Sequence, residues 1–136
     1  MVKEEIKVPA VRQELDTVIG LLERLLEEEG CSPKMMIAIA IAVEEAYINI
    51  ADYAYPGTRG DCTFSVCIED GQATMILKDQ GIPYDPLAKE DPDITLSADE
   101  RQIGGLGIYM AKKTMDDIHY ERKDEQNILT MMKRIG

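Results

Sequence analysis

One stretch near the middle of the chain restricts its fold more than any other: CTFSVCIEDGQATMILKD, residues 62–79. It consists of two strand-like runs joined at Asp70-Gly71, a dipeptide favoured in the two-residue turns of β-hairpins. A second pair of strand-like runs, DIHYERKDEQNILTMMKRI, occupies residues 117–135. Since a hairpin joins antiparallel neighbours, these two segments predict a sheet that is mostly antiparallel.

Two helices are expected before the first hairpin. The first is amphipathic, with apolar residues in a four-three rhythm at Val11, Leu15, Val18, Leu22 and Leu25. Gly30 stands where a glycine usually follows the last helical turn. The second helix begins at CSPKMM, where Ser32 suits the N-cap and Pro33 the first helical position, and we expect it to continue through Tyr55. Its run IAIAIA alternates like a strand, but alanine's helix propensity and the segment's length favour a helix.

The order of expected elements indicates an α+β protein. A short strand at EEIKVPA, the two helices, a hairpin, a long loop, a short helix and a second hairpin follow one another. This order predicts a two-layer sandwich in which helices cover one face of a mixed, mostly antiparallel sheet. At 136 residues the chain fits a single domain, 1–136. The loop after residue 79 is rich in proline and aspartate, and a loop of that length in a small domain is usually functional.

Composition excludes several classes of function. The net charge of −11 argues against nucleic-acid binding, because contacts to a phosphate backbone need a basic surface. Three cysteines without close metal-ligand spacing and one histidine argue against a zinc site or a histidine-based triad. The longest apolar run, 35–43, is too short to cross a membrane. We read no secretory segment at the start, and therefore expect a cytoplasmic protein with reduced thiols.

The expected second helix carries polar residues that a buried helix would not need. Glu45 and Asn49 are four residues apart and therefore share one helical face. A carboxylate beside an amide oxygen suits a Mg²⁺ ligand set and the orientation of a nucleophilic hydroxyl or water. Taken alone, a solvated stripe on the helix explains the pattern equally well.

Two further stretches are individually weak signals. In DQGIPYDP, Asp79 follows a strand and is able to accept a hydrogen bond from an exocyclic amine. Gly81 would let a ligand approach the backbone. GGLGIYM offers backbone N–H groups at a helix start through Gly104, Gly105 and Gly107, an arrangement that suits phosphate. Alone, each stretch also fits an ordinary turn.

Together, the order EEAYINIADYAYPG, DQGIPYDP and GGLGIYMAKKTMDD resembles the N, G1 and G2 boxes of the GHKL ATPase superfamily, which has the Bergerat (histidine-kinase-type) ATPase fold. Within it, the chain resembles the anti-sigma-factor serine/threonine kinases. The resemblance implies a kinase that binds ATP and Mg²⁺, phosphorylates an anti-anti-sigma antagonist and sequesters a sigma factor. It implies no direct nucleic-acid or membrane partner, and it leaves pairing with a second copy open, since relatives commonly form dimers.

The resemblance also assigns roles to residues. Glu45 would be the catalytic base and Asn49 the Mg²⁺ ligand, while Asp79 would hold the adenine amine with Gly81 close to the ring. The glycines of the third box (Gly104, Gly105 and Gly107) would lie by the phosphates, and residues 85–103 would form an ATP lid. By this assignment, the polar side chains of the second helix, Glu44 and Asp52 included, would face a nucleotide cleft.

Two positions depart from the family pattern. Tyr53 stands where relatives often have histidine, and Gln126-Asn127 stands roughly where relatives often have a Gly-Thr pair whose threonine helps to hold the adenine. Asn127 is able to hydrogen-bond in its place. Neither departure removes the base or the metal ligand, and two functions follow: a serine/threonine kinase, or a non-catalytic ATP-binding module that sequesters a partner protein.

Overall fold

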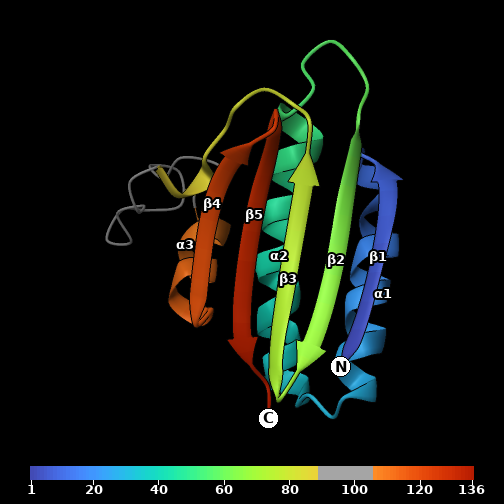
Figure 1. The fold of residues 1–136 in the computed structure, drawn as a ribbon, viewed down its shortest axis with the longest axis vertical. Coiled ribbons are helices and arrows are strands. Elements are labelled where there is room, and N and C mark those ends of the chain that lie inside the picture. Colours follow the sequence, from blue (N-terminus) through green and yellow to red (C-terminus); the bar gives the residue numbers. More distant parts are fainter. Residues whose placement is uncertain (89–105) are drawn as a thin grey trace.

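The computed structural model describes residues 1–88 and 106–136 and arranges them as a sheet and a layer of helices (Figure 1). The strands are β1 (Val2–Pro9), β2 (Asp61–Glu69), β3 (Gln72–Asp79), β4 (Asp117–Lys123) and β5 (Gln126–Arg134). The helices are α1 (Leu15–Glu28), α2 (Pro33–Tyr53) and α3 (Leu106–Thr114), with 3₁₀ turns at Arg12–Glu14 and Pro86–Ala88. Most of the predicted lid, residues 89–103, and the glycines Gly104 and Gly105 lie outside the described residues.

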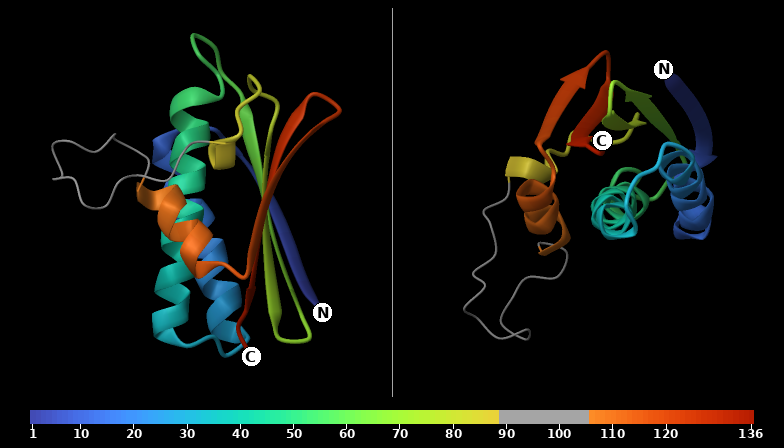
Figure 2. Two further views of the ribbon diagram at one scale, coloured as in Figure 1. Left: turned by 90° about the vertical axis from the view of Figure 1, so that its left-hand side faces the viewer. Right: turned by 90° about the horizontal axis from the view of Figure 1, so that it is seen from below.

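The sheet has the strand order β1-β2-β3-β5-β4, and each pair of neighbours is antiparallel. The helices lie against one face of this sheet, with α2 between α1 and α3 (Figure 2). The α+β prediction is confirmed, and the sheet expected to be mixed is antiparallel among the described strands. Because β5 pairs with β3 as well as β4, the two hairpins join into one sheet, and the start of β5 lies beside the end of β3.

Local chemistry sets the element boundaries much as predicted. Asp70 and Gly71 have φ angles of 51° and 74°, the left-handed conformation that a type I′ hairpin turn requires. The Ser32 hydroxyl accepts a hydrogen bond from the Met35 N–H at 3.3 Å, so Ser32 caps α2. Two helix ends differ from expectation: α2 stops at Tyr53, and a 3₁₀ turn precedes α1 at Leu15.

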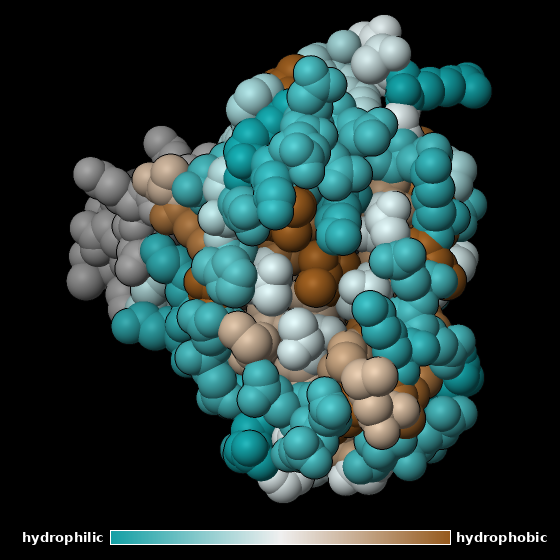
Figure 3. Space-filling model, viewed as in Figure 1, coloured by the Kyte–Doolittle hydropathy of each residue, from teal (hydrophilic) through white to brown (hydrophobic). Residues whose placement is uncertain are grey.

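The core lies between the sheet and the helices and is built from alternate residues of the strands. Buried positions of β2, β3 and β5 meet leucines of α1 and the inner face of α2; the largest of these side chains are Phe64, Val66, Met75, Leu77, Met131, Leu22, Leu25, Leu26, Ile39, Val43 and Tyr47. The opposite face of the sheet is open, and its surface is mostly hydrophilic with neutral and apolar side chains near the centre (Figure 3). Among the described residues, no helix combines the length and apolarity needed to cross a bilayer.

Candidate functional site

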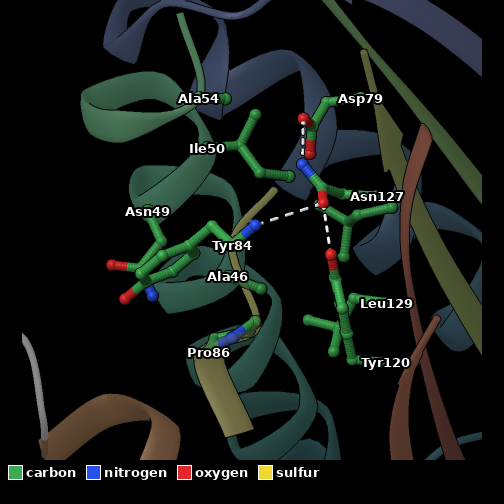
Figure 4. A pocket seen from close by; sticks show the side chains of 11 residues that line it. Ala46, Asn49, Ile50, Ala54, Asp79, Tyr84, Pro86, Tyr120, Asn127 and Leu129 are labelled. Carbon is green, nitrogen blue, oxygen red and sulfur yellow. Dashed lines mark hydrogen bonds between the residues drawn. The ribbon is translucent and has the colours of Figure 1, made fainter. Parts of the chain in front are cut away.

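A cavity lies between α2 and the ends of β3 and β5 (Figure 4). Its walls are mostly apolar, and its polar groups come from two of the three predicted motif regions and from β4 and β5. The lining residues are Ala46, Asn49, Ile50, Ala54, Leu77, Asp79, Tyr84, Pro86, Tyr120, Asn127 and Leu129. The fold therefore brings Asn49, Asp79 and Asn127 together, although up to 78 residues separate them in the sequence.

Asp79 lines the cavity, and one of its carboxylate oxygens has no hydrogen-bond partner among the described residues. It is only 4% exposed, and its Oδ1 accepts hydrogen bonds from the Gly81 N–H and from Asn127 Nδ2, each at 2.9 Å. Within the described part of the chain, Oδ2 accepts no hydrogen bond. Burying an unpaired carboxylate oxygen is costly, so this atom is a ready acceptor for an N–H donor supplied by a ligand.

Burial also shifts the protonation of Asp79. Removal from water raises the pKa of its carboxyl above the ordinary value, and the hydrogen bonds from Asn127 and Gly81 and the charge of Arg122 oppose that shift only in part. A donor at Oδ2 would stabilise the ionised form further. The electrostatics of Asp79 therefore favour a ligand that donates a hydrogen bond there.

Asn127 uses its whole carboxamide within the protein. Its Nδ2 donates to Asp79 and to the Ile82 carbonyl at 2.8 Å, while its Oδ1 accepts from the Tyr84 N–H at 3.3 Å and from the Tyr120 hydroxyl. An asparagine side chain has two N–H donors and an oxygen with two lone pairs, so these contacts occupy all of its positions. In this arrangement Asn127 orients Asp79 and ties the segment after β3 to β4 and β5.

Replacing Asn127 with alanine should therefore destabilise the fold by about 2–3 kcal/mol, because it leaves several buried polar groups without partners. Chemical denaturation measures the effect. Gln126→Ala, a neighbouring change on the open face of the sheet, is the matched control and should stay within about 0.5 kcal/mol of the original protein. Equal stability of the two variants would contradict the structural role of Asn127.

Asn49 is a further buried polar group that lines the cavity. It is 8% exposed, and its carboxamide makes no hydrogen bond to the described residues. In the same part of the chain, no three His, Cys, Asp or Glu side chains gather into a metal-binding group. A magnesium ion here would take the amide oxygen of Asn49 as a ligand, and Mg²⁺ commonly keeps several waters and binds phosphates as well.

The segment after β3 forms one wall of the cavity, whose volume is about 30 Å³. Tyr84 and Pro86 form this wall, and the Tyr84 ring also lies 6.2 Å from the ring of Tyr53 between centroids. Tyr53, the departure from the family histidine, thus packs beside Tyr84 and is 49% exposed.

Glu45 faces a neighbouring hollow rather than the cavity itself. That hollow is lined by Arg12, Leu15, Ile41, Glu44, Glu45, Ile48 and Gly107. The first turn of α3 lies directly against the carboxylate, because a Cβ atom added at Gly107 would come within 2.4 Å of Glu45 Cδ. Glu45 and Gly107 therefore lie in contact, and Asn49, one turn along α2 from Glu45, lines the cavity.

Gly81 has a structural reason to be glycine that needs no ligand. A Cβ atom there would lie 2.2 Å from the carbonyl oxygen of Ala54, just after α2. The Ile82 N–H donates to that same oxygen at 2.9 Å, and Arg122 Nη1 donates to the Gly81 carbonyl at 2.8 Å. The residue thus joins the end of α2 to the sheet. Its predicted approach to a ligand stays a prediction.

Two of the acidic residues expected to face the cleft lie elsewhere. Asp52 receives two hydrogen bonds from Arg12, at 2.9 Å from Nε and 2.6 Å from Nη2, and this partner lowers the pKa of its carboxyl. Glu44 is exposed and lines the hollow on the outer side of α2. Sequence reasoning also missed Tyr84 and Tyr120, both of which line the cavity.

Comparisons with known proteins identify relatives of the whole domain. A family model described as a histidine kinase-like ATPase domain matches residues 8–133. The serine/threonine-protein kinase BtrW of Bordetella bronchiseptica is 26% identical over 111 residues, which cover 81% of this chain and 78% of that protein. The serine-protein kinase RsbW of Bacillus mycoides is 24% identical over 131 residues, which cover 93% of this chain and 82% of that protein.

Solved structures share the same fold. The RsbU and RsbW domains of a Mycobacterium tuberculosis protein align with a TM-score of 0.71 at 17% identity, over 99% of this chain and 33% of that longer chain. The SiaB–SiaC complex of Pseudomonas aeruginosa gives a TM-score of 0.61 at 17% identity, over 96% of this chain and 88% of the matched one. At this identity the likeness concerns the fold alone.

Proposed function

The chain belongs to the histidine kinase-like ATPase domain family, and from this premise we propose that it is a serine/threonine protein kinase that uses ATP. Its substrate is an anti-anti-sigma protein, and it acts as an anti-sigma factor in the cytoplasm by sequestering a sigma factor. BtrW and RsbW, the relatives that align over most of this chain, are protein kinases.

One observation carries the proposal at the level of the site. Asp79, whose Oδ2 accepts no hydrogen bond from the described residues, and Asn49, whose carboxamide makes none with them, line the same cavity. Glu45 lies one turn along α2 from Asn49. A nucleotide supplies what each group lacks: an amine donor for Asp79, and phosphate-bound Mg²⁺ for Asn49. The base then lies beside the phosphate end of the nucleotide.

The proposed site residues have two kinds of role: most bind the nucleotide, and one accepts a proton. Asp79 accepts the adenine amine, with Gly81 and Asn127 holding the acceptor in place, and Asn49 provides an oxygen for Mg²⁺. Gly107, in the first turn of α3, would offer its backbone N–H to the phosphates, and Gly104 and Gly105 are proposed to share this role. Mg²⁺, held by the Asn49 oxygen, would supply charge neutralisation at the phosphates when bound. Glu45 takes the proton of the incoming hydroxyl, whose oxygen forms a bond to the γ-phosphorus while the bond between that phosphorus and ADP breaks.

The direct test is phosphotransfer to a purified protein. The chain is incubated with labelled ATP, Mg²⁺ and each anti-anti-sigma candidate encoded in the same genome, and the phosphorylated residue is mapped by mass spectrometry. We expect one candidate to be labelled on a serine or threonine. A chain that binds ATP and a candidate but labels none would instead be the non-catalytic ATP-binding module.

Asn49→Ala should weaken nucleotide binding only where Mg²⁺ takes part. Loss of the amide oxygen removes one metal ligand, so we expect ADP affinity to fall about tenfold, or ~1.4 kcal/mol, in Mg²⁺ buffer. With the metal chelated, the variant and the original protein should bind ADP alike. Calorimetric titrations under both conditions measure the difference. A variant equally weakened with and without Mg²⁺ would show that Asn49 acts on the cavity wall and not on the metal.

A further inference from the structure

The outer face of α2 carries large apolar side chains that the fold leaves uncovered. Ile37 is 62% exposed and Ile41 is 48% exposed. The two isoleucines stand one helical turn apart, and the row continues along the helix to Glu45 and Ile48. Apolar side chains aligned on the solvent side of a helix are typical of a surface that another molecule covers.

Two neighbouring hollows follow this row and share Ile41 and Glu44. One extends over Met36 and Ile37 toward Glu23 of α1, and the other contains the proposed base. We call the continuous surface formed by Met36, Ile37, Ile41, Glu44, Glu45 and Ile48 the α2 groove. It is apolar at one end and reaches the reacting centre at the other.

We propose that the α2 groove is the docking surface for the protein that the kinase phosphorylates. The partner has protruding apolar side chains flanked by lysine or arginine, close to the hydroxyl that accepts the phosphate. The proposal rests on the proposed function, because the groove has this meaning only if a protein hydroxyl must reach Glu45.

The charges along the groove indicate which charge the partner has at the contact. Its rim has two exposed carboxylates, Glu23 and Glu44, and neither has an ion-pair partner in the described part of the chain. Arg12, a cation that lines it among the described residues, is bound by Asp52 at 2.6 Å. The rim is therefore acidic, which favours basic side chains on the partner. It disfavours a second copy of this chain, whose net charge is −11 and whose groove would meet its own acidic rim.

The length of the groove suits a single contact surface. Ile37 and Glu45 are eight residues apart on one helix, a distance of about 12 Å at the rise of an α-helix. About four residues of extended chain span that distance. A partner held by Ile37 and Ile41 can therefore place a nearby hydroxyl at Glu45 without a long flexible connection.

Polar substitutions at the apolar end test the docking role apart from catalysis. Ile37→Ser and Ile41→Ser are titrated calorimetrically with each anti-anti-sigma candidate of the same genome, in ADP and Mg²⁺ so that no phosphate is transferred. We expect each variant to raise the Kd for the partner about tenfold, with ADP affinity and thermal stability unchanged. Ile76→Ser, which places the same change on the open face of the sheet, is the matched control and should bind the partner normally.

Each outcome decides between the two proposals. If the serine variants bind the partner as tightly as the original protein, or if no candidate binds the original protein, the docking proposal is wrong. If binding depends on the two isoleucines but no phosphate is transferred when ATP replaces ADP, the α2 groove is a docking surface for the partner and the proposed kinase function is wrong. If sedimentation shows self-association that Ile37→Ser abolishes, the groove's occupant is a second copy and the proposal is overturned.

Reversing a rim charge tests the predicted chemistry of the partner. Glu44→Lys should slow association and weaken the complex severalfold, and the loss should shrink at high salt. Tighter binding by this variant would mean that the partner is acidic at the contact, which would contradict the proposal.

Discussion

Replacing Glu45 with alanine should lower the rate of phosphoryl transfer by about 10²–10⁴-fold while leaving ATP affinity nearly unchanged. A general base acts mainly in the transition state, and its removal typically costs a factor of this size. Nucleotide binding should persist because Asp79 and Asn49 line a cavity that Glu45 does not line. A single-turnover rate with saturating substrate protein, measured beside an ATP titration, separates the two effects.

The control for this experiment uses the contact between Glu45 and Gly107. Glu45→Gln keeps the size of the side chain and its packing against the first turn of α3, but an amide cannot take a proton. If Glu45 is the base, the glutamine variant should be about as slow as the alanine variant. If the glutamine variant transfers phosphate at the original rate, the carboxylate serves only to position α3.

The parts of the fold that were predicted well depend on chemistry between neighbours in the sequence. Asp70-Gly71 adopts the left-handed angles of a hairpin turn, and Ser32 caps the helix that Pro33 begins. The second hairpin followed from its strand pattern alone. Its turn consists of Asp124 and Glu125 at φ of 52° and 63°, a conformation that neither residue type signals strongly.

The site was only partly predictable because its contacts cross the sheet. Asp79 and Asn49 stood out as polar residues at the ends of apolar segments. The pairing of Asp79 with Asn127 depends on β5 lying beside β3 in one register, which no local pattern encodes. The ion pair between Arg12 and Asp52 likewise joins residues 40 positions apart. Tyr120 occupies an inward position of β4, so strand alternation was the one signal that could have identified it.

Asp79→Asn should abolish most nucleotide affinity without harming the fold. The asparagine oxygen can keep both hydrogen bonds that Oδ1 now accepts, from Gly81 and Asn127, which directs the new N–H₂ group to the position of Oδ2. Two donors, that group and the adenine amine, would then face each other. Losing a charge-assisted hydrogen bond costs about 1.5–3 kcal/mol, so ADP affinity should fall roughly 10–150-fold.

The folding stability of the Asp79→Asn variant, compared with that of the original protein, gives a second test, because the direction of its change with pH is predicted. Burial makes the pKa of Asp79 higher in the folded chain than in the unfolded chain, so the folded state binds this proton more tightly. The ionised carboxylate therefore destabilises the fold near neutral pH, and the neutral amide should be at least as stable there. As the pH falls through the raised pKa, the original protein should gain stability relative to the variant. Thermal unfolding across that range, beside an ADP titration, tests both expectations. A variant that binds ADP normally would refute the adenine role, and one that unfolds would show that Asp79 serves the fold.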